Sequence, residues 1–321
     1  MTNNTKPSGI DWIGDIPAEW QLSRIKYCYV IILGKMLQPY QERNTDRELY
    51  YMCSANVTWN GIDLSVLKQM WFSPSEIKEY LLKRGDLLIA EGGDVAIASI
   101  WNNEIPECCI QNALHLIKCN GINSNKFLFY WLFFLKNNGY VDLICNKATI
   151  AHFTKEKFGA SPFILPPPKE QQAIAAFLDT QCKMIDNIIA EMEQQIGVLK
   201  QYKTALITET VTKGLDKTVP MKDSGIDWTG KIPAHWEIAR IKYCYDIILG
   251  KMLQPSQERS TDREMNYMCS ANVTWDGIDL STLKQMWFSP SEIKSYLLKK
   301  GDLLVAEGGD VAIASIWNNE V

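Results

Sequence analysis

One polar stretch, GKMLQPYQERNTDRE between Gly34 and Glu48, is rich in side chains that can recognise the edges of DNA bases. Base readout requires the forked or paired donors and acceptors of Arg, Lys, Asn and Gln, presented on loops. The stretch offers Lys35, Gln38, Gln41, Arg43 and Arg47. Almost the same stretch returns later in the chain, with Lys251, Gln254 and Arg259. The alternative for each residue is a solvated loop without a ligand, so the residue types indicate a candidate contact surface.

Two further segments carry candidate contacts. SANVTWNG contributes Asn56 and Trp59, and its later copy contributes Asn272 and Trp275. A lone tryptophan is more often a core residue than a stacking platform. EGGDV puts Asp94 on a glycine-rich turn that could come close to a backbone. It is a weak match to a phosphate-binding loop, because no Lys-Ser or Lys-Thr pair follows it.

Other chemistries find little support in the residue pattern. Asp63 with Glu76 and Lys78 mimics the D…ExK arrangement of a metal-dependent nuclease, yet Glu76 and Lys78 fall in the first turns of an expected helix. The three histidines are scattered, the nine cysteines contain no CxxC pair, and no glycine-rich cofactor loop is evident. We therefore expect no catalytic residue, no metal site and no cofactor in this chain, and a nuclease is the least favoured alternative.

Length and composition are those of an ordinary globular protein. The 321 residues are enough for two domains, and 46% are hydrophobic and 22% charged. A net charge of −4 argues against binding nucleic acid by overall charge alone, although clustered basic residues are compatible with it. The opening MTNNTKPSG is polar, and the most apolar run, Phe127–Leu135, is far shorter than a membrane span. We expect a cytoplasmic protein without membrane contact.

Residues 8–104 return as residues 224–320, because Trp12 recurs as Trp228, 216 positions later, and the register holds without a gap. Roughly 16 positions differ, which indicates the duplication of a domain. The non-conservative differences predict solvent-facing positions: Asp15/Lys231, Glu19/His235, Gln21/Glu237, Val30/Asp246 and Tyr50/Asn266. The second copy has no counterpart of Pro106–Leu215. We expect this to reflect either a premature stop or a fragment.

Residues 8–120 are predicted to be rich in short strands, because runs such as KYCYVIIL, LYYMCSANVTW, DLLIA and AIASIW alternate with Gly, Asp and Asn turns. Among them, SPSEIKEYLLKRGD predicts a short helix that Ser73 or Ser75 caps and Gly85 ends. Residues 124–138 predict a second, buried helix. The prolines of LPPPKEQQ form a stiff lead-in to the segment that follows.

The clearest physical signal is a long helix from Glu170 to about Lys213, which contains no proline and only one glycine, Gly197. Apolar residues recur at alternating steps of four and three, as in the a/d seam of a coiled coil. The members of this seam are Leu178, Cys182, Ile185, Ile189, Met192, Ile196, Leu199 and Leu206. A helix of about 40 residues is about 60 Å long. So narrow an apolar stripe predicts pairing with another long helix, from this chain or another.

Several segments together resemble the specificity subunit of type I restriction–modification enzymes. They are SGIDWIGDIPAEWQLSRIKY, ANVTW, GDLLIAEGGDVA, ATIAHFTKEKF, LPPPKEQQAIAAFLD and the long heptad helix that closes in TETVTKGLD. The resemblance implies an α+β fold. Its parts would be a globular target-recognition domain with a mixed sheet (1–168), a coiled-coil spacer helix (169–216) and a partial second recognition domain (217–321).

The resemblance also implies a role without catalysis, in which each recognition domain reads one half of a bipartite double-stranded DNA target. It adds four residues to the DNA-facing set: Gln111, Asn112, Thr149 and His152. In such subunits the spacer helices dock the methyltransferase (M) subunits, and the complex recruits the restriction (R) subunits. Those partners, and not this chain, would use S-adenosylmethionine, ATP and Mg²⁺.

Two consequences follow for a chain with one spacer helix and two nearly identical domains. Two chains could pair their helices in trans as a self-dimer, and both domains, if folded, would read the same half-sequence. The alternative, from another class, is a truncated interaction protein that binds methyltransferase subunits through the spacer helix without useful DNA reading.

Overall fold

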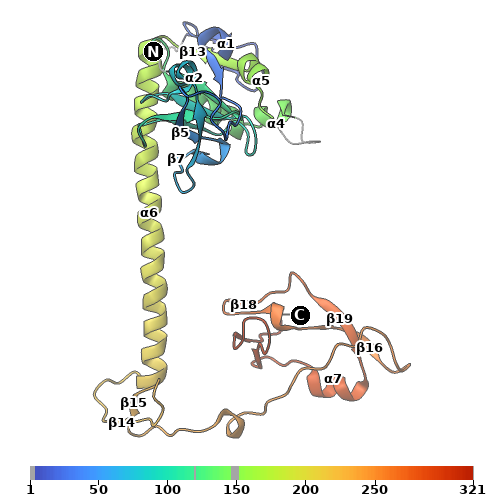
Figure 1. Ribbon diagram of the computed structural model, residues 1–321. Coiled ribbons are helices and arrows are strands. Elements are labelled where there is room, and N and C mark those ends of the chain that lie inside the picture. The colour runs from blue at the N-terminus through green and yellow to red at the C-terminus, as the bar shows by residue number, and fades with distance from the viewer. Residues whose placement is uncertain (1–3, 119–120, 146–151, 321) are drawn as a thin grey trace. The chain divides into compact units, whose positions relative to one another are not determined.

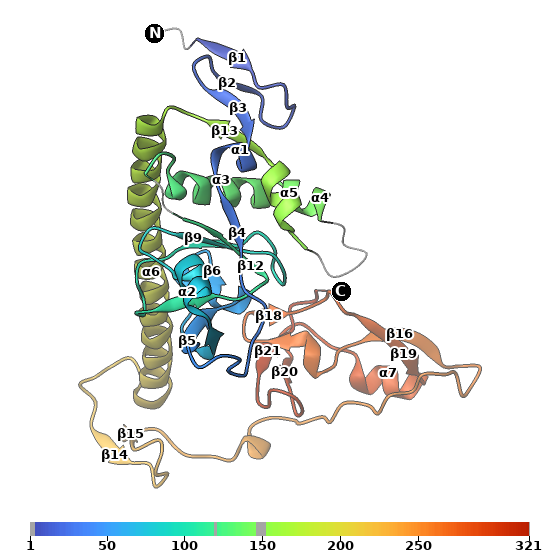
Figure 2. The ribbon, with the colours of Figure 1, turned by 45° about the horizontal axis from the view of Figure 1, so that its top comes forward.

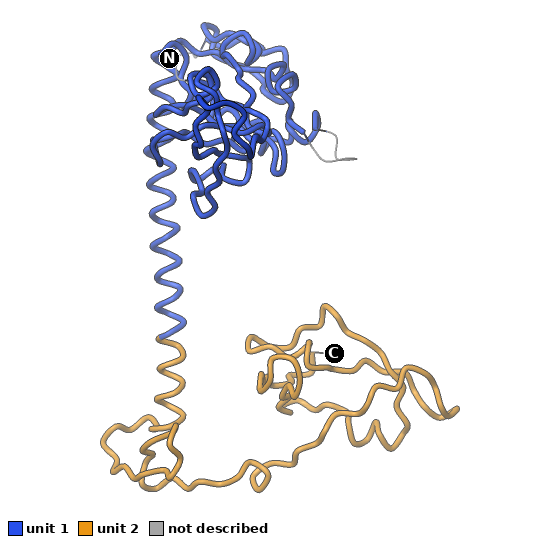
Figure 3. Tube along the Cα trace, in the orientation of Figure 1, with its two compact units in different colours: residues 1–201 blue, residues 202–321 orange. Residues whose placement is uncertain are grey.

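The structure is a computed structural model that describes residues 4–118, 121–145 and 152–320 (Figure 1). The chain forms two compact units, residues 1–201 and 202–321, and the boundary falls inside a long helix (Figure 3). Within the described ranges, no helix is both long and apolar enough to cross a membrane.

The strands of the first unit form small sheets. The largest has the order β10-β9-β12-β4 and is antiparallel throughout; its strands are β4 (Ile31–Leu33), β9 (Leu87–Ala90), β10 (Ala98–Ile100) and β12 (Leu114–Ile117). In a mixed sheet, β5 (Arg47–Met52) lies between parallel β11 (Cys108–Ile110) and antiparallel β8 (Lys68–Phe72). Two-stranded pairs join β1 (Thr5–Pro7) to β2 (Asp15–Pro17), β3 (Gln21–Arg24) to β13 (Pro162–Leu165), and β6 (Val57–Thr58) to β7 (Gly61–Ile62). This mixture of sheets and helices confirms the predicted α+β class.

The four-stranded sheet is buried on both faces, and all residues of β9 and β12 are inaccessible. Because side chains alternate along a strand, Leu87 and Ile89 belong to the cluster that includes Leu132 of α3 (Asn125–Asn137). Leu88 belongs to the cluster on the other face, with Met52 of the mixed sheet. Helix α3 packs against β10 and β9, and Figure 2 shows it running beside the sheet. The sheet is therefore the middle layer of the unit.

The remaining helices of the first unit are α1 (Ile25–Cys28), α2 (Pro74–Tyr80), α4 (Tyr140–Ile144), α5 (Lys155–Ala160) and α6 (Pro168–Lys213), with a 3₁₀ turn η1 (Ser54–Asn56). The hydroxyl of Ser73 caps α2 and that of Ser124 caps α3, each by accepting a backbone amide hydrogen bond. The predicted end of α2 at Gly85 is wrong. The helix ends at Tyr80, because the chain is extended from Leu81 onward. Leu82 is buried there, and its amide donates to the Cys108 carbonyl (2.9 Å).

The predicted single strand in KYCYVIIL is also wrong, because the helical turn α1 precedes the short strand β4. The turn buries Ile25 and Tyr29 in the core, and the Tyr29 amide donates to the Ile25 carbonyl (2.9 Å). The five non-conservative differences between the copies do lie at exposed positions in the first unit, as predicted: Asp15, Glu19, Gln21, Val30 and Tyr50.

Helix α6 confirms the predicted long helix and spans 46 residues, about 69 Å. Pro168 is its first residue, where a missing amide hydrogen is tolerated. The first turns pack against the unit, since the indole of Trp20 donates to Glu170 (2.9 Å) and the hydroxyl of Tyr130 donates to Asp179 (2.9 Å). Between 180 and 208 every residue except Gly197 is exposed.

The second unit repeats many of the elements found between β1 and β10 of the first. They are β14 (Met221–Asp223), β15 (Lys231–Pro233), η2 (Ile241–Tyr243), β16 (Arg263–Tyr267), η3 (Ser270–Asn272), β17 (Val273–Thr274), β18 (Gly277–Ile278), β19 (Lys284–Phe288), α7 (Pro290–Tyr296), β20 (Leu303–Val305) and β21 (Ala314–Ile316). Residues 247–249, the counterparts of β4, form no strand, because residues 202–320 contain no counterpart of β12 to pair with them. Trp59 packs edge to face on Phe129 and Phe133 of α3, whereas Trp275 is 72% exposed, because residues 202–320 contain no counterpart of α3 either.

Candidate nucleic-acid interface

The topology of the four-stranded sheet brings distant polar segments to one edge. Strand β12 is antiparallel to both β4 and β9, so that Leu114 pairs with Ala90 and His115 with Leu33. The start of β12 therefore lies beside the ends of β4 and β9. Residues 34–46, 91–94 and 111–113, which adjoin these three strand ends, are termed the loop edge below.

Backbone contacts fix the first part of the loop edge. The Gly34 amide donates to the Leu114 carbonyl (3.0 Å), and the Asn112 amide donates to the Lys35 carbonyl (2.6 Å). A Cβ on residue 34 would lie only 2.2 Å from the Gln111 carbonyl oxygen. The polar loop that begins at Lys35 is thus held against Gln111 and Asn112, two residues that the family resemblance had added to the DNA-facing set.

Ala113 joins the other segments to this edge. It has a left-handed backbone (φ 72°), which is unusual for a residue with a side chain. Its carbonyl accepts hydrogen bonds from the Ser54 hydroxyl (2.7 Å) and from the Glu91 amide (2.9 Å). The Glu91 carbonyl in turn accepts from the Phe153 amide (2.8 Å), which places His152 beside the Gly92 turn. Four of the candidate segments therefore converge, although they are far apart in the sequence.

His115 holds the segment that follows His152 in place from inside the core. Its ring is fully buried, stacks on Phe158, and has Nε2 2.8 Å from the Phe153 carbonyl oxygen and 3.7 Å from Glu91. Burial lowers the pKa of His115 more than the Phe153 carbonyl and the Glu91 carboxylate raise it. The neutral ring therefore donates from Nε2 to the Phe153 carbonyl. Sequence reasoning did not identify His115 as a positioning residue.

The loop after β4 is held by side chains that point inward. The ammonium of Lys35, which is 8% exposed, donates to Glu76 (2.5 Å) and to the Gln38 side chain. Glu76 also accepts from the Ser73 amide (2.8 Å), so one carboxylate links the loop to the start of α2. The Gln38 carbonyl accepts from the Trp71 amide of β8 (3.0 Å). The loop is tied to the mixed sheet and to α2 rather than free.

A buried carboxylate closes the far end of the same loop. Asp46 accepts hydrogen bonds from the amides of Arg43 (2.9 Å) and Glu42 (3.3 Å). The side-chain amide of Gln41 donates to the Asp46 carbonyl (3.4 Å). The loop framework of the first unit is therefore Lys35, Gln38, Asp46, Ser73 and Glu76.

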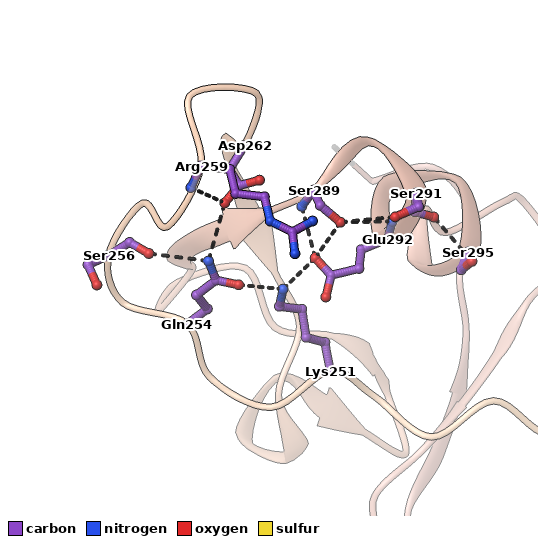
Figure 4. A network of polar contacts seen from close by, with 9 residues as sticks. All are labelled: Lys251, Gln254, Ser256, Arg259, Asp262, Ser289, Ser291, Glu292 and Ser295. Atoms are coloured by element: carbon purple, nitrogen blue, oxygen red, sulfur yellow. Dashed lines mark hydrogen bonds and ion pairs between the residues drawn. The ribbon is translucent and has the colours of Figure 1, made fainter.

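The second unit contains the same framework, drawn in Figure 4. Lys251 donates to Glu292 (2.5 Å) and to Gln254 (2.7 Å), and Glu292 accepts from the Ser289 amide (2.8 Å). Asp262 again accepts from a backbone amide, that of Arg259 (3.0 Å). The framework consists of Lys251, Gln254, Asp262, Ser289 and Glu292, and it forms although the second unit has no counterpart of residues 106–165. Its geometry therefore does not depend on residues 106–165.

The ion pairs of the two frameworks predict a carboxylate that stays charged in acid. Partial burial acts to raise the pKa of Glu76, but hydrogen bonds from Lys35 and Ser73 outweigh it and place that pKa below its usual range. In the second unit the hydrogen bond from Lys251, followed by those from Ser289, lowers the pKa of Glu292 to about 2. An unfolded glutamate has a pKa of about 4.3.

Because the folded pKa lies below the unfolded one, the framework stabilises the loop fully above about pH 4.3 and loses this contribution as the pH falls through about 2. We expect a ¹³C NMR titration of the Glu292 carboxyl to have its midpoint near pH 2, and the Glu292→Gln variant to lose that resonance. A midpoint at or above about 4.3 would contradict the ion pair.

Several predicted contact residues have structural partners instead of facing solvent. Lys35, Gln38 and their copies Lys251 and Gln254 belong to the frameworks described above. The side-chain NH₂ of Asn56 donates to the carbonyls of Asp63 (2.8 Å) and Val66 (3.1 Å), and its Oδ1 accepts from the Cys53 backbone amide (3.0 Å). Asn272 is buried in the same kind of turn. We therefore leave these residues, and the packed ring of Trp59, out of the DNA surface proposed below.

Other predicted residues remain available at the surface. Gln41, Arg43 and His152 are exposed, Gln111 and Asn112 are half-buried at the loop edge, and Arg259 is exposed in the second unit. Asp94 is exposed but paired with Lys136 (2.7 Å), and Arg47 pairs with Glu107 (2.7 Å). Thr149 lies outside the described residues. Contact of any of these residues with DNA stays a prediction.

Two residues at the interface were missed from the sequence. Lys136, at the end of α3, donates to Asp94 (2.7 Å) and to the Val95 carbonyl (2.8 Å), and so fixes the glycine-rich turn. Glu76 was considered only as a nuclease ligand. The SPSE pattern indicates its capping role, but its pairing with Lys35, 41 positions away, has no local signal.

The nuclease alternative has no geometric support. The Asp63 carboxylate accepts from the Ser65 amide (2.8 Å), and Glu76 is engaged with Lys35 and Ser73. Within the described part of the chain, no group of three or more His, Cys, Asp or Glu side chains could hold a metal ion.

The predicted apolar seam of α6 lies at the surface over most of its length. Ile185, Ile189, Met192, Ile196, Leu199 and Leu206 are each about half exposed or more, and Cys182 is also exposed. Leu178, in the packed first turns, is half-buried. An exposed run of isoleucine, leucine and methionine at heptad spacing is the surface that a partner helix covers in a coiled coil. No contact in the described structure covers this seam.

The first unit is an α+β domain with a cluster of polar loops, and it is followed by a long, mostly exposed helix. Comparison with known sequences assigns this part of the chain to a protein family. Residues 17–197 match the family model described as "Type I restriction modification DNA specificity domain". The match covers more than half of the chain, so this chain belongs to the family of type I restriction–modification DNA specificity domains.

Curated relatives and solved structures are similar to this chain at low identity. The MjaVIII specificity subunit of Methanocaldococcus jannaschii is 27% identical over 307 residues, which cover 93% of this chain and 64% of that protein. The EcoBI specificity subunit of Escherichia coli is 25% identical over 74% of this chain and 50% of that protein. The crystal structure of the HsdS subunit from Thermoanaerobacter tengcongensis has a TM-score of 0.43 at 19% identity, covering 66% of this chain and 49% of that one. The chain thus spans about half to two thirds of the length of these relatives.

Proposed function

We propose that this chain is a non-catalytic specificity subunit of a type I restriction–modification complex and that the loop edge of its first unit reads double-stranded DNA. The observation that carries the proposal is the convergence of residues 34–46, 91–94, 111–113 and His152 at one edge of a buried sheet. Loops that are fixed by a rigid scaffold and rich in Gln, Asn and Arg have the chemistry of base-edge readout. Gln41, Arg43, Gln111, Asn112 and His152 are the proposed contacts.

The proposed partners follow from the family and from the exposed seam of α6. Methyltransferase subunits, or the helix of a second chain, would cover the seam, and restriction subunits would join through the assembled complex. Those partners would supply the chemistry that uses S-adenosylmethionine, ATP and Mg²⁺. We place the complex in the cytoplasm, where its DNA substrate lies. An interaction protein that docks partners without reading DNA is the second candidate, which the exposed seam alone would also support.

Selection from a random double-stranded DNA library with the full chain tests the proposed function. At about 0.15 M salt we expect enrichment of a defined sequence over non-specific DNA. If Arg43 contacts a base, the Arg43→Ala variant should lose about 1–3 kcal/mol of binding free energy. If Arg43 contacts a phosphate, the slope of log K against the logarithm of the salt concentration should decrease in magnitude by about one.

Arg84→Ala is the matched control, because exposed Arg84 precedes β9 at the end opposite the loop edge. Its affinity and sequence preference should stay close to those of the unaltered chain. Binding without any sequence preference would favour the interaction protein over the DNA reader.

A further inference from the structure

The two copies of the polar loop are an internal comparison within one chain. Between 34–48 and 250–264 the sequences differ at two positions only, with Tyr40 and Asn44 in the first loop and Ser256 and Ser260 in the second. Every other residue of the loop is the same.

The shared residues are those that hold the loop. Lys35 and Lys251 donate to Glu76 and Glu292 at 2.5 Å in each case. Each lysine also donates to the side-chain oxygen of the glutamine three residues later, Gln38 or Gln254. The side-chain amides of the two glutamines also donate to the same backbone position, the carbonyls of Tyr40 and Ser256, both at 3.3 Å. The loops therefore share their lysine, glutamine and glutamate contacts even though their surroundings differ, and Gln254 alone also donates to Asp262 (3.5 Å).

Both differing positions carry exposed side chains. Tyr40 is 80% exposed, and Asn44, Ser256 and Ser260 are exposed as well. In Figure 4 the side chain of Ser256 points away from the framework, while its carbonyl accepts the bond from Gln254. Substitution at these positions leaves the framework intact, because the framework uses only the backbone at position 40 and none of its hydrogen bonds involves the side chain at position 44.

The chemistry of the two pairs differs in what it can recognise. An asparagine can make a paired hydrogen bond to adenine, and a tyrosine ring can stack on a base or touch a thymine methyl group. A serine hydroxyl reaches a short distance and bonds donors and acceptors alike. The framework and the shared Arg43 and Arg259 would place both loops in the same way on DNA. The residues at Tyr40/Ser256 and Asn44/Ser260 would then distinguish the bases.

We propose that Tyr40 and Asn44 in the first loop, and Ser256 and Ser260 in the second, are specificity-determining residues, so that the two loops prefer different bases. The inference rests on the proposed function of the loop edge. It also replaces the expectation that two near-identical domains read one half-sequence, because the two positions that differ are exposed on a common framework.

The test is to convert the first loop into the second in the full chain with the double variant Tyr40→Ser, Asn44→Ser. Selection from a random double-stranded DNA library should then enrich a site that keeps some base preferences of the unaltered chain and changes others. We expect the altered base positions to lose about 5- to 150-fold in discrimination. Thermal unfolding should be unchanged, because the same serines already occupy this framework in the second unit.

The control is Tyr50→Asn, which also copies the residue of the second unit at an exposed position but lies within β5 rather than in the loop. It should leave the enriched site unchanged. If the double variant enriches the same site with the same base preferences as the unaltered chain, the inference is wrong while the proposed function stands. If the unaltered chain enriches no sequence at all, the proposed function fails and the inference with it.

Discussion

Replacing Gly34 by alanine is expected to destabilise the first unit by about 3 kcal/mol or more, which is the upper part of the range for overpacking. The added Cβ would lie 2.2 Å from the Gln111 carbonyl oxygen and 2.4 Å from its carbon. Both are backbone atoms in a bridge that pairs Lys35 with Gln111, so no side chain can move away. Relief requires separating the chain at Gly34 from the start of β12, which would also break the hydrogen bonds of the Gly34 amide and the Asn112 amide.

The duplicated domain supplies the matched control for this prediction. Gly250 is the counterpart of Gly34 in the second unit, and a Cβ there would meet nothing within 4 Å. Gly250→Ala should therefore change stability by no more than about 0.5 kcal/mol. Thermal unfolding of each variant, followed by hydrogen exchange with mass spectrometry, would measure the stability of each unit separately.

For the Gly34→Ala variant we expect the unfolding midpoint of the first unit to fall by about 6–12 °C, taking 2–4 °C for each kcal/mol. Specific DNA binding should decrease in parallel, since the loop edge is the part displaced. Equal effects of the two alanine substitutions would contradict the close backbone crossing at the loop edge.

Placing acidic residues in the exposed seam of α6 is expected to abolish helix pairing. Ile189 and Ile196 are 49% and 52% exposed and lie seven residues apart, at equivalent heptad positions. In a pair of helices each would bury an isoleucine worth about 1.5–3 kcal/mol. The double variant Ile189→Glu, Ile196→Glu loses both contributions and adds two charges that the seam would have to desolvate. We expect the association constant to fall by about 100-fold or more, since 1.4 kcal/mol corresponds to tenfold.

The control adds the same two charges to the other side of the helix, in the double variant Ala190→Glu, Gln194→Glu. Sedimentation velocity over a range of concentrations should show self-association of the unaltered chain and of this control, but not of the seam variant. Circular dichroism should show equal helix content in all three chains. If the unaltered chain sediments as a folded monomer at every concentration, the self-dimer is excluded, and the same variants can be tested for binding to methyltransferase subunits.

The sequence by itself determined the elements whose signals are local. A proline-led stretch of 46 residues without an internal proline specified α6, and its step of four and three specified the seam. The start of α2 was predicted at Ser73 or Ser75 and that of α3 near residue 124, and Ser73 and Ser124 cap them, because a cap is a contact over three residues. The duplication and several exposed positions within it were also readable, since the non-conservative differences between the copies lie where side chains are exposed.

The tertiary structure decided which polar residues are free to bind and which hold the fold. Lys35 and Asn56 have the residue types of DNA contacts, but both are buried. The Asn56 side chain is bonded within its own turn, to the Asp63 carbonyl, and Lys35 pairs with a glutamate 41 positions away. Strand β12 pairs with β4, more than 80 residues earlier in the sequence, and with β9, more than 20 residues earlier. Such pairings depend on which apolar faces can be buried together and not on local preference. Only that assembly gathers the loops at one edge of the sheet, and its absence around residues 247–249 leaves the same sequence without a strand.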